Sequence, residues 1–112
     1  MTAQVIIRCK YSGNKFIVLE NEKGEIVVFA DDDRRFRLHK ELLQQYCEET
    51  GLSAKCLGGG YIHMKEKSVS LTGTSTDFGT EPNRDETVTA IKEVYPEYVV
   101  KGNTLVIGSG FL

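Results

Sequence analysis

Several features that the sequence lacks narrow its possible functions. No apolar run approaches the roughly 20 residues needed to cross a bilayer. Residues 1–8 enter a strand pattern without the basic, apolar and cleavage regions of a secretory signal. The three cysteines, Cys9, Cys47 and Cys56, include no CxxC pair, which argues against a disulfide framework or a zinc site. We therefore expect a cytoplasmic protein whose thiols are small buried apolar groups rather than nucleophiles.

An excess of charge of one sign is also missing. The 14 Lys and Arg residues face 16 Asp and Glu residues, which gives a formal net charge of −2. Affinity for nucleic acid comes mainly from clustered cations, so this balance argues against a general binder of the phosphate backbone. With 112 residues, 40% of them hydrophobic and 27% charged, the chain is expected to form one domain over residues 1–112. No repeat or linker divides it.

What the sequence does contain is a series of short strand patterns. Strands are expected at residues 4–10, 15–20, 25–29, 61–65, 68–72, 97–100 and 104–107. The second and third are expected to form a hairpin that turns at residues 21–24, and Gly102 and Asn103 are expected to turn the chain between the last two. The uninterrupted apolar run in the first strand favours a buried, central position in the sheet.

Two segments change to a helical period. The apolar positions within residues 36–50 form a single stripe and are Leu38, Leu42, Leu43, Tyr46 and Cys47. Those of the second helix, over residues 82–95, are Val88, Ile91, Val94 and Tyr95. Gly51 is a natural stop for the first helix, and the Tyr95-Pro96 pair ends the second. Two helices interspersed with about six strands predict a compact α/β or α+β layer structure.

Of the two histidines, His39 is the stronger candidate for chemistry. A histidine is more often an ordinary surface or core residue, and His63, which alternates within a strand, is expected to be structural. His39 falls near the start of the first helix, where the macrodipole disfavours a protonated imidazole. We therefore expect His39 to be neutral at pH 7 and able to accept a proton from water.

Two glycine-rich segments accompany His39. Gly58, Gly59 and Gly60 fit a tight turn or close backbone packing, and they also fit a wall that a substrate can approach. Residues 73–79 (Gly-Thr-Ser-Thr-Asp-Phe-Gly) follow a strand and precede a helix. Ordinary turn chemistry explains this loop, and so does an anion-binding nest of successive amides. Neither segment is a Walker A or GxGxxG motif.

A basic cluster precedes the histidine. Arg34, Arg35 and Arg37 fit a solvated face of the molecule. They also fit a source of positive potential that draws an anion toward His39. The sequence leaves both interpretations open.

Taken in their order along the chain, these segments resemble those of the phosphohistidine phosphatase (Janus/Ocnus) family. The resemblance rests on Cys-Leu-Gly-Gly-Gly-x-Ile at residues 56–62, Gly-x-Ser-x-x-aromatic-Gly at residues 73–79, and Ile-Lys-x-x-Tyr-Pro-x-Tyr at residues 91–98. A hydrophobic-Ile-Arg segment at residues 6–8 and the helix-opening His39 complete it. The resemblance implies a mixed β-sheet of about six strands packed between two helices in a single compact domain, with no metal or other cofactor.

The resemblance also implies hydrolysis of the P–N bond of phosphohistidine in a protein substrate. We expect a monomer that has no nucleic-acid or membrane partner. His39 would be the general base for an attacking water. Phosphate oxygens would be held by the amides of His39 and Lys40, and by those of Ser75, Thr76 and Asp77, helped by the Ser75 hydroxyl. The alternatives are a non-catalytic module of the same fold that recognises a phosphorylated or acidic partner, and a structural domain without phosphate affinity.

The sequence departs from the family pattern at three points. The family's basic residue after the triple glycine is Tyr61 here, and its lysine near the start of the first strand is replaced by Ala3 or Gln4. Asp77 places a carboxylate where the family has a small apolar residue, and a carboxylate repels a bound phosphate. The candidates to restore the missing positive charge are Arg34, Arg35, Arg37 and Lys40.

Overall fold

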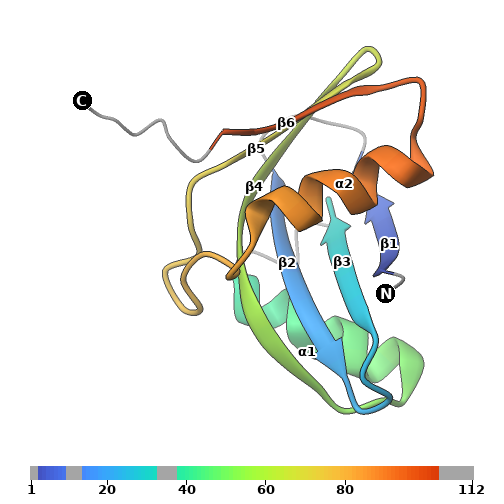
Figure 1. Ribbon diagram of the computed structural model, residues 1–112. Coiled ribbons are helices and arrows are strands. Elements are labelled where there is room, and N and C mark those ends of the chain that lie inside the picture. Colours follow the sequence, from blue (N-terminus) through green and yellow to red (C-terminus); the bar gives the residue numbers. More distant parts are fainter. Residues whose placement is uncertain (1–2, 10–13, 33–37, 104–112) are drawn as a thin grey trace.

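The computed structural model of the chain describes residues 3–9, 14–32 and 38–103, which form a mixed sheet and two helices (Figure 1). The strands are β1 (Ala3–Arg8), β2 (Asn14–Asn21), β3 (Ile26–Asp31), β4 (Ala54–Lys65), β5 (Ser68–Thr72) and β6 (Val99–Asn103). The helices are α1 (His39–Thr50) and α2 (Arg84–Val94). The predicted class, an α+β domain with about six strands and two helices, is confirmed.

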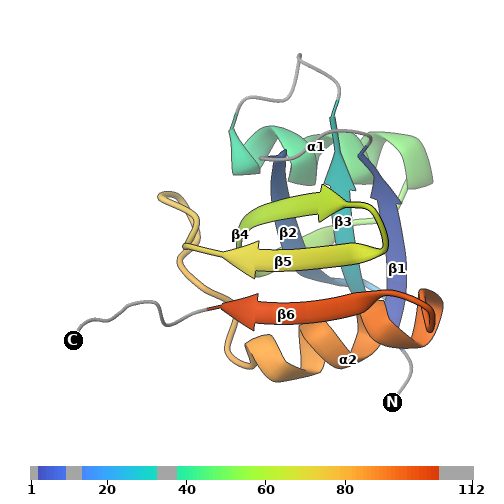
Figure 2. The same ribbon diagram turned by 90° about the horizontal axis from the view of Figure 1, so that it is seen from above.

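The six strands form one sheet in the order β1-β3-β2-β4-β5-β6. β2 and β3 are the predicted antiparallel hairpin, and Gly24 in its turn has a φ of +80°, which glycine adopts without strain. The outer strands β1 and β6 pair in parallel with β3 and β5. The sheet curls, with α1 against one face and α2 against the other (Figure 2). No helix in the described ranges has the length and apolar character needed to span a membrane.

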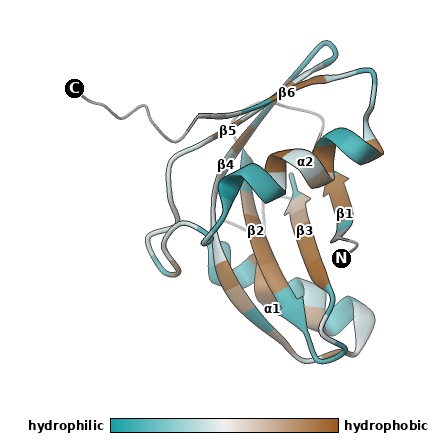
Figure 3. Ribbon diagram, in the orientation of Figure 1, coloured by the Kyte–Doolittle hydropathy of each residue, from teal (hydrophilic) through white to brown (hydrophobic). Residues whose placement is uncertain are grey.

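Two hydrophobic clusters, one on each face of the sheet, form the core. On the α1 face, Leu42 and Tyr46 pack against a set of buried strand residues, which are Ile17, Leu19, Val27 and Phe29. On the α2 face, Ile91 packs against Phe16, Val18, Val28, Ala30, Ile62, Val69 and Leu71. Successive residues of β2 and β3 therefore enter opposite clusters, which explains why these strands read as continuous apolar runs (Figure 3).

Three expectations about the strands are wrong. β1 lies at an edge of the sheet and not at its centre. Its apolar run is uninterrupted because Val5 and Ile7 pack on the α2 face and Ile6 packs on the α1 face, so this edge strand is covered on both sides. The strand expected at residues 61–65 starts earlier, because β4 begins at Ala54 and includes the triple glycine, which excludes the tight-turn interpretation. Gly102 continues β6 instead of turning the chain, and the strand expected at residues 104–107 lies outside the described residues.

The cysteines are less buried than expected, but the two whose pKa is shifted agree with the expectation of inert thiols. Cys9, Cys47 and Cys56 are half-buried, and all three are free. Burial raises the pKa of the Cys9 thiol to about 12 and that of the Cys56 thiol to about 11. Because the thiolate is the nucleophilic form, these two thiols are poor nucleophiles at neutral pH.

Candidate functional site

His39, the first residue of α1, is buried and anchored to the main chain of β4. Its side chain is only 3% exposed, and its Nε2 lies 2.8 Å from the carbonyl oxygen of Gly60. A carbonyl oxygen can only accept a hydrogen bond, so Nε2 carries the proton and Nδ1 of the neutral ring keeps its lone pair. The Gly60 contact therefore selects the tautomer that leaves Nδ1 able to act as a base.

The surroundings of His39 favour its neutral form. Burial is the main cause that lowers the pKa of His39 below the ordinary 6.5, and the positive charge of Lys15 lowers it further. The hydrogen bond to Gly60 and the negative charge of Asp77 act in the opposite direction. The predicted direction of the pKa shift is thus confirmed, but its leading cause is desolvation, where the sequence suggested the helix dipole.

The start of α1 leaves main-chain donors without an acceptor. Its N-cap residue is Leu38, whose side chain cannot accept a hydrogen bond, while the Glu41 carboxylate accepts one from the Leu38 amide at 2.8 Å. The amides of His39 and Lys40 are in the first turn, where no intrahelical acceptor exists. No acceptor for either amide is found within the part of the chain that the structure describes. Such a helix start is suited to an anion.

The loop at residues 73–79 is held against β4 by its own main chain. The Ser75 amide donates to the carbonyl oxygens of Gly59 (3.1 Å) and Gly79 (3.3 Å), and the Gly79 amide donates to Ser75 at 2.8 Å. The Ser75 hydroxyl oxygen accepts from the Phe78 amide at 3.1 Å. The prediction that the Ser75 amide holds phosphate therefore needs correction, because that amide is committed to the sheet. Its hydroxyl proton remains for donation.

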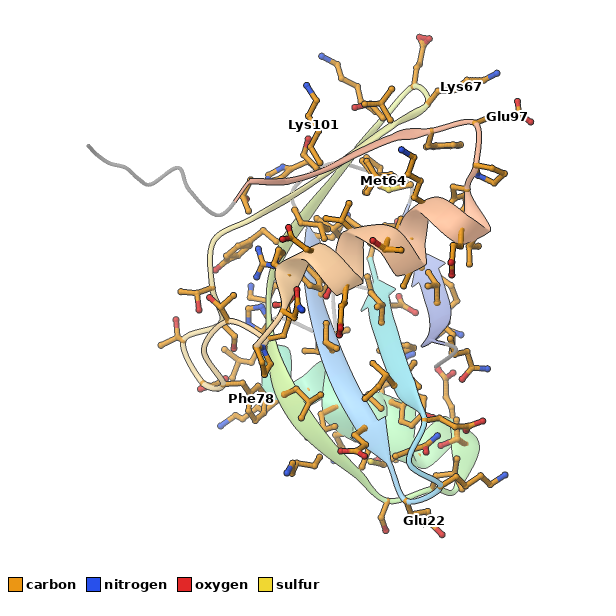
Figure 4. The ribbon with its side chains drawn as sticks, viewed as in Figure 1. Glu22, Met64, Lys67, Phe78, Glu97 and Lys101 are labelled. Atoms are coloured by element: carbon orange, nitrogen blue, oxygen red, sulfur yellow. The ribbon has the colours of Figure 1, made fainter. Side chains whose placement is uncertain are left out.

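The outer part of this loop is arranged differently and lies near His39. Thr76 and Asp77 are exposed, and no acceptor for their amides is found among the described residues. The loop lies beside the first turn of α1 in both ribbon views (Figures 1 and 2), and Phe78 is seen on that side of the molecule in Figure 4. The charge of Asp77 is close enough to raise the pKa of His39. His39, Lys40, Thr76 and Asp77 thus share one corner of the fold.

Lys15 is a site residue that the sequence analysis missed. It faces Tyr61 across the β2–β4 pair, and its ammonium nitrogen lies 5.6 Å from the centroid of the Tyr61 ring. That ring in turn meets the His39 ring edge-on, with 5.7 Å between centroids. Lys15 therefore supplies positive charge beside the imidazole. Ala3 and Gln4, where the sequence comparison placed the family's lysine, lie on the edge strand β1, which is separated from β4 by β3 and β2.

The other basic candidates receive less support. Lys40 is exposed on the first turn of α1, and only its amide is tied to the site by the helix geometry. Arg34, Arg35 and Arg37 lie outside the described residues. His63, expected to be structural, pairs through Nε2 with the Thr72 hydroxyl at 3.0 Å.

A buried ion pair behind the site was also missed. The Arg84 guanidinium donates to the Glu81 carboxylate at 2.8 and 2.9 Å, and Glu81 also accepts from the Thr87 hydroxyl. Arg84 Nη2 additionally donates to the carbonyl oxygens of Gly59 (3.2 Å) and Gly73 (3.1 Å). Arg84 therefore joins the glycine run of β4 to the loop that follows β5. From the sequence alone, Glu81 and Arg84 are only polar residues near the start of a helix.

The glycines of β4 allow these close approaches. A Cβ atom at Gly60 would lie 2.5 Å from the Thr72 carbonyl oxygen, and one at Gly58 would lie 2.2 Å from the Glu81 amide nitrogen. Gly58 also has a φ of +149°, which side chains with a Cβ rarely adopt. Of the two interpretations of the triple glycine, close backbone packing is the one that the structure shows.

The comparison with known families agrees with the resemblance at the level of the family. The model of the Janus/Ocnus family (Ocnus) matches residues 7–99. This match covers most of the chain, which therefore belongs to the Janus/Ocnus family. No match is found among curated proteins. Within the described residues, no group of three or more His, Cys, Asp or Glu side chains is arranged to hold a metal ion.

Proposed function

We propose that this chain is a protein-histidine phosphatase that hydrolyses the P–N bond of phosphohistidine without a metal. The observation that carries the proposal is the state of His39. Its Nε2 proton is held by the Gly60 carbonyl, its pKa is lowered, and it stands at the start of a helix whose first amides have no acceptor. A neutral base beside main-chain donors without an acceptor is suited to phosphoryl transfer to water.

In this mechanism the phosphoryl group lies between the start of α1 and the loop at residues 73–79. The amides of His39 and Lys40 donate to its oxygens from one side, and those of Thr76 and Asp77, with the Ser75 hydroxyl, donate from the other. The Lys15 ammonium offsets part of the phosphoryl charge. Asp77 opposes binding through its carboxylate while contributing through its amide. These donors act mainly by stabilising the negative charge of the transition state.

The chemical step moves one proton and one phosphoryl group. A water oxygen forms a bond to phosphorus as the P–N bond breaks, and His39 Nδ1 takes the proton of the attacking water. The substrate imidazole, protonated on its other nitrogen, leaves as neutral histidine with the electron pair of the P–N bond. Because this leaving group departs readily, the protein has mainly to orient water and stabilise phosphoryl charge.

The test is orthophosphate release from a phosphohistidine peptide in the presence of EDTA. We expect release by the wild type and a loss of about 10²–10⁴-fold in His39→Ala, the usual contribution of a general base. The matched control is His63→Ala, which removes the other histidine and should retain activity. No release by the wild type, or undiminished release by His39→Ala, would remove the proposal.

The second candidate is a non-catalytic module that binds a phosphorylated or acidic partner. Asp77 and Tyr61 favour it, because one adds negative charge near His39 and the other replaces the family's basic residue. This candidate predicts phosphate-induced NMR shifts at the Lys40 and Thr76 amides without turnover. A structural domain without phosphate affinity predicts no shifts at either amide.

A further inference from the structure

A groove on the α2 face of the sheet has no part in the site described above. It has a volume of about 390 Å³. Its floor is apolar and comes from Val18, Ile26 and Val28 on β2 and β3, with Leu57 of β4 beside them. Figure 3 shows the apolar strand surface that continues below α2. The His39 site lies on the opposite face, where α1 packs.

The groove exists because α2 covers only part of this face. The helix crosses the upper part of the sheet in Figure 1, and Ile91 anchors it in the core. Below it, Val18 and Val28 are almost fully buried, but Ile26 and Leu57 are only partly covered. A partly open apolar floor of this kind is typical of a binding surface.

The wall formed by α2 is acidic. Glu86 and Glu93 line the groove and are exposed, and they are seven residues apart, which places them about 10 Å apart along the helix. No ion pair to either carboxylate is found within the described residues. The remaining acid of the lining, Glu81, is neutralised by Arg84. Among the described residues that line the groove there is no Lys or Arg, so the two exposed carboxylates leave an excess of negative charge there.

We propose that this groove binds a peptide segment with apolar side chains between two Lys or Arg residues. The apolar side chains cover the floor near Ile26 and Leu57, and the basic side chains pair with Glu86 and Glu93. A peptide in the polyproline II conformation has three residues per turn and rises about 3.1 Å per residue, so basic residues three positions apart lie on the same side and about 9 Å apart, close to the spacing of the two carboxylates. The charge pattern of the wall and the apolar floor together select this occupant.

The test is a titration of ¹⁵N-labelled protein with a capped tetrapeptide that has lysine at both ends and two leucines between them. We expect saturable amide shifts centred on Glu86, Thr89, Ala90 and Glu93. The double variant Glu86→Lys/Glu93→Lys should weaken binding by at least about tenfold, which corresponds to the loss of two favourable charge pairs. Binding should also weaken as salt is raised.

The matched control reverses two exposed carboxylates elsewhere. Glu48→Lys/Glu66→Lys changes the net charge by the same amount on α1 and on the β4–β5 turn, and should leave the affinity unchanged. A peptide with glutamate in place of lysine, or with serine in place of leucine, should cause little shift. Equal weakening by the two double variants, or shifts absent or centred on α1, would overturn the proposal.

Two further outcomes are informative. If the groove amides shift with protein concentration alone, the occupant is a second copy of the chain and the peptide proposal is wrong. His39→Ala should bind the tetrapeptide with wild-type affinity, because the two sites lie on opposite faces. The peptide-binding proposal and the phosphatase proposal can therefore be disproved independently of each other.

Discussion

The two faces of the sheet hold their buried ionisable groups in opposite ways. On the α1 face, His39 makes one hydrogen bond to a main-chain carbonyl and its pKa is lowered, so it stays neutral. On the α2 face, Arg84 makes four hydrogen bonds, two of them to Glu81, and stays charged and paired. Both donate hydrogen bonds to main-chain carbonyls in the glycine run of β4, His39 to Gly60 and Arg84 to Gly59. The α1 face thus carries the base of the proposed reaction, and the α2 face carries a charge pair that fixes the main chain around it.

Of the changes considered, loss of the Arg84 side chain is expected to lower the free energy of unfolding most. Arg84→Met leaves the Glu81 carboxylate buried without its partner, which should lower the free energy of unfolding by about 3–5 kcal/mol. Urea denaturation measures the change. The control is Glu81→Leu/Arg84→Met, which removes both charges and should be much closer to the wild type. A double variant as unstable as the single one would show that the charge pair is not what Arg84 provides.

A methyl group added in the glycine run of β4 is expected to cause the next largest loss of stability. Gly58→Ala forces its Cβ against the Glu81 main chain at a positive φ and should destabilise the protein by about 3 kcal/mol, the upper end of the usual cost of overpacking. Gly24→Ala is the matched control, because Gly24 also has a positive φ but open space around it. It should lose only about 1 kcal/mol. Equal losses in urea denaturation would mean that backbone conformation, and not the close approach, sets the cost.

The lowered pKa of His39 predicts the pH dependence of the proposed phosphatase reaction. The base is active when deprotonated, so activity should be retained as pH falls to 6.5 and be lost only at more acidic pH, as the imidazole gains its proton. A titration of the His39 ring by NMR should have its midpoint below 6.5. A midpoint above 6.5 would mean that Asp77 and Gly60 outweigh burial.

The smallest effect is expected from the two charges that flank His39. Lys15→Met should raise the pKa of His39 and Asp77→Asn should lower it, because the two charges act on it in opposite directions. The same NMR titration measures both changes. Shifts of the same sign in the two variants would contradict the arrangement of Lys15 and Asp77 on the α1 face.

The sequence predicted the elements best where hydrophobic spacing is decisive. The 3.6-residue stripe located α1, including Leu42 and Tyr46, and the alternation in β5 gave that strand its observed bounds. It misplaced β1, because an apolar run does not distinguish a central strand from an edge strand that helices cover on both sides. It left the role of Gly58 open between a turn and close packing, because no local pattern shows that the Glu81 backbone approaches it.

For the candidate site, local motifs located the imidazole and the loop but not the residues that support them. Lys15 could have been found from the alternation in β2, because it lies two and four residues before Ile17 and Leu19, which face α1. The donor role of the Ser75 amide could not be judged, since its partners come from Gly59 and Gly79 in three dimensions. Arg84 resembles a surface residue at a helix start until its partners are known.

The hydrogen bond from His39 to Gly60 has a spectroscopic consequence. A ring N–H that is shielded from water and bonded to a carbonyl exchanges its hydrogen slowly, so it should give its own downfield resonance in the proton NMR spectrum. That signal would report directly on the geometry of the protein with no ligand bound. Its broadening on warming would mark the temperature at which the first turn of α1 separates from β4.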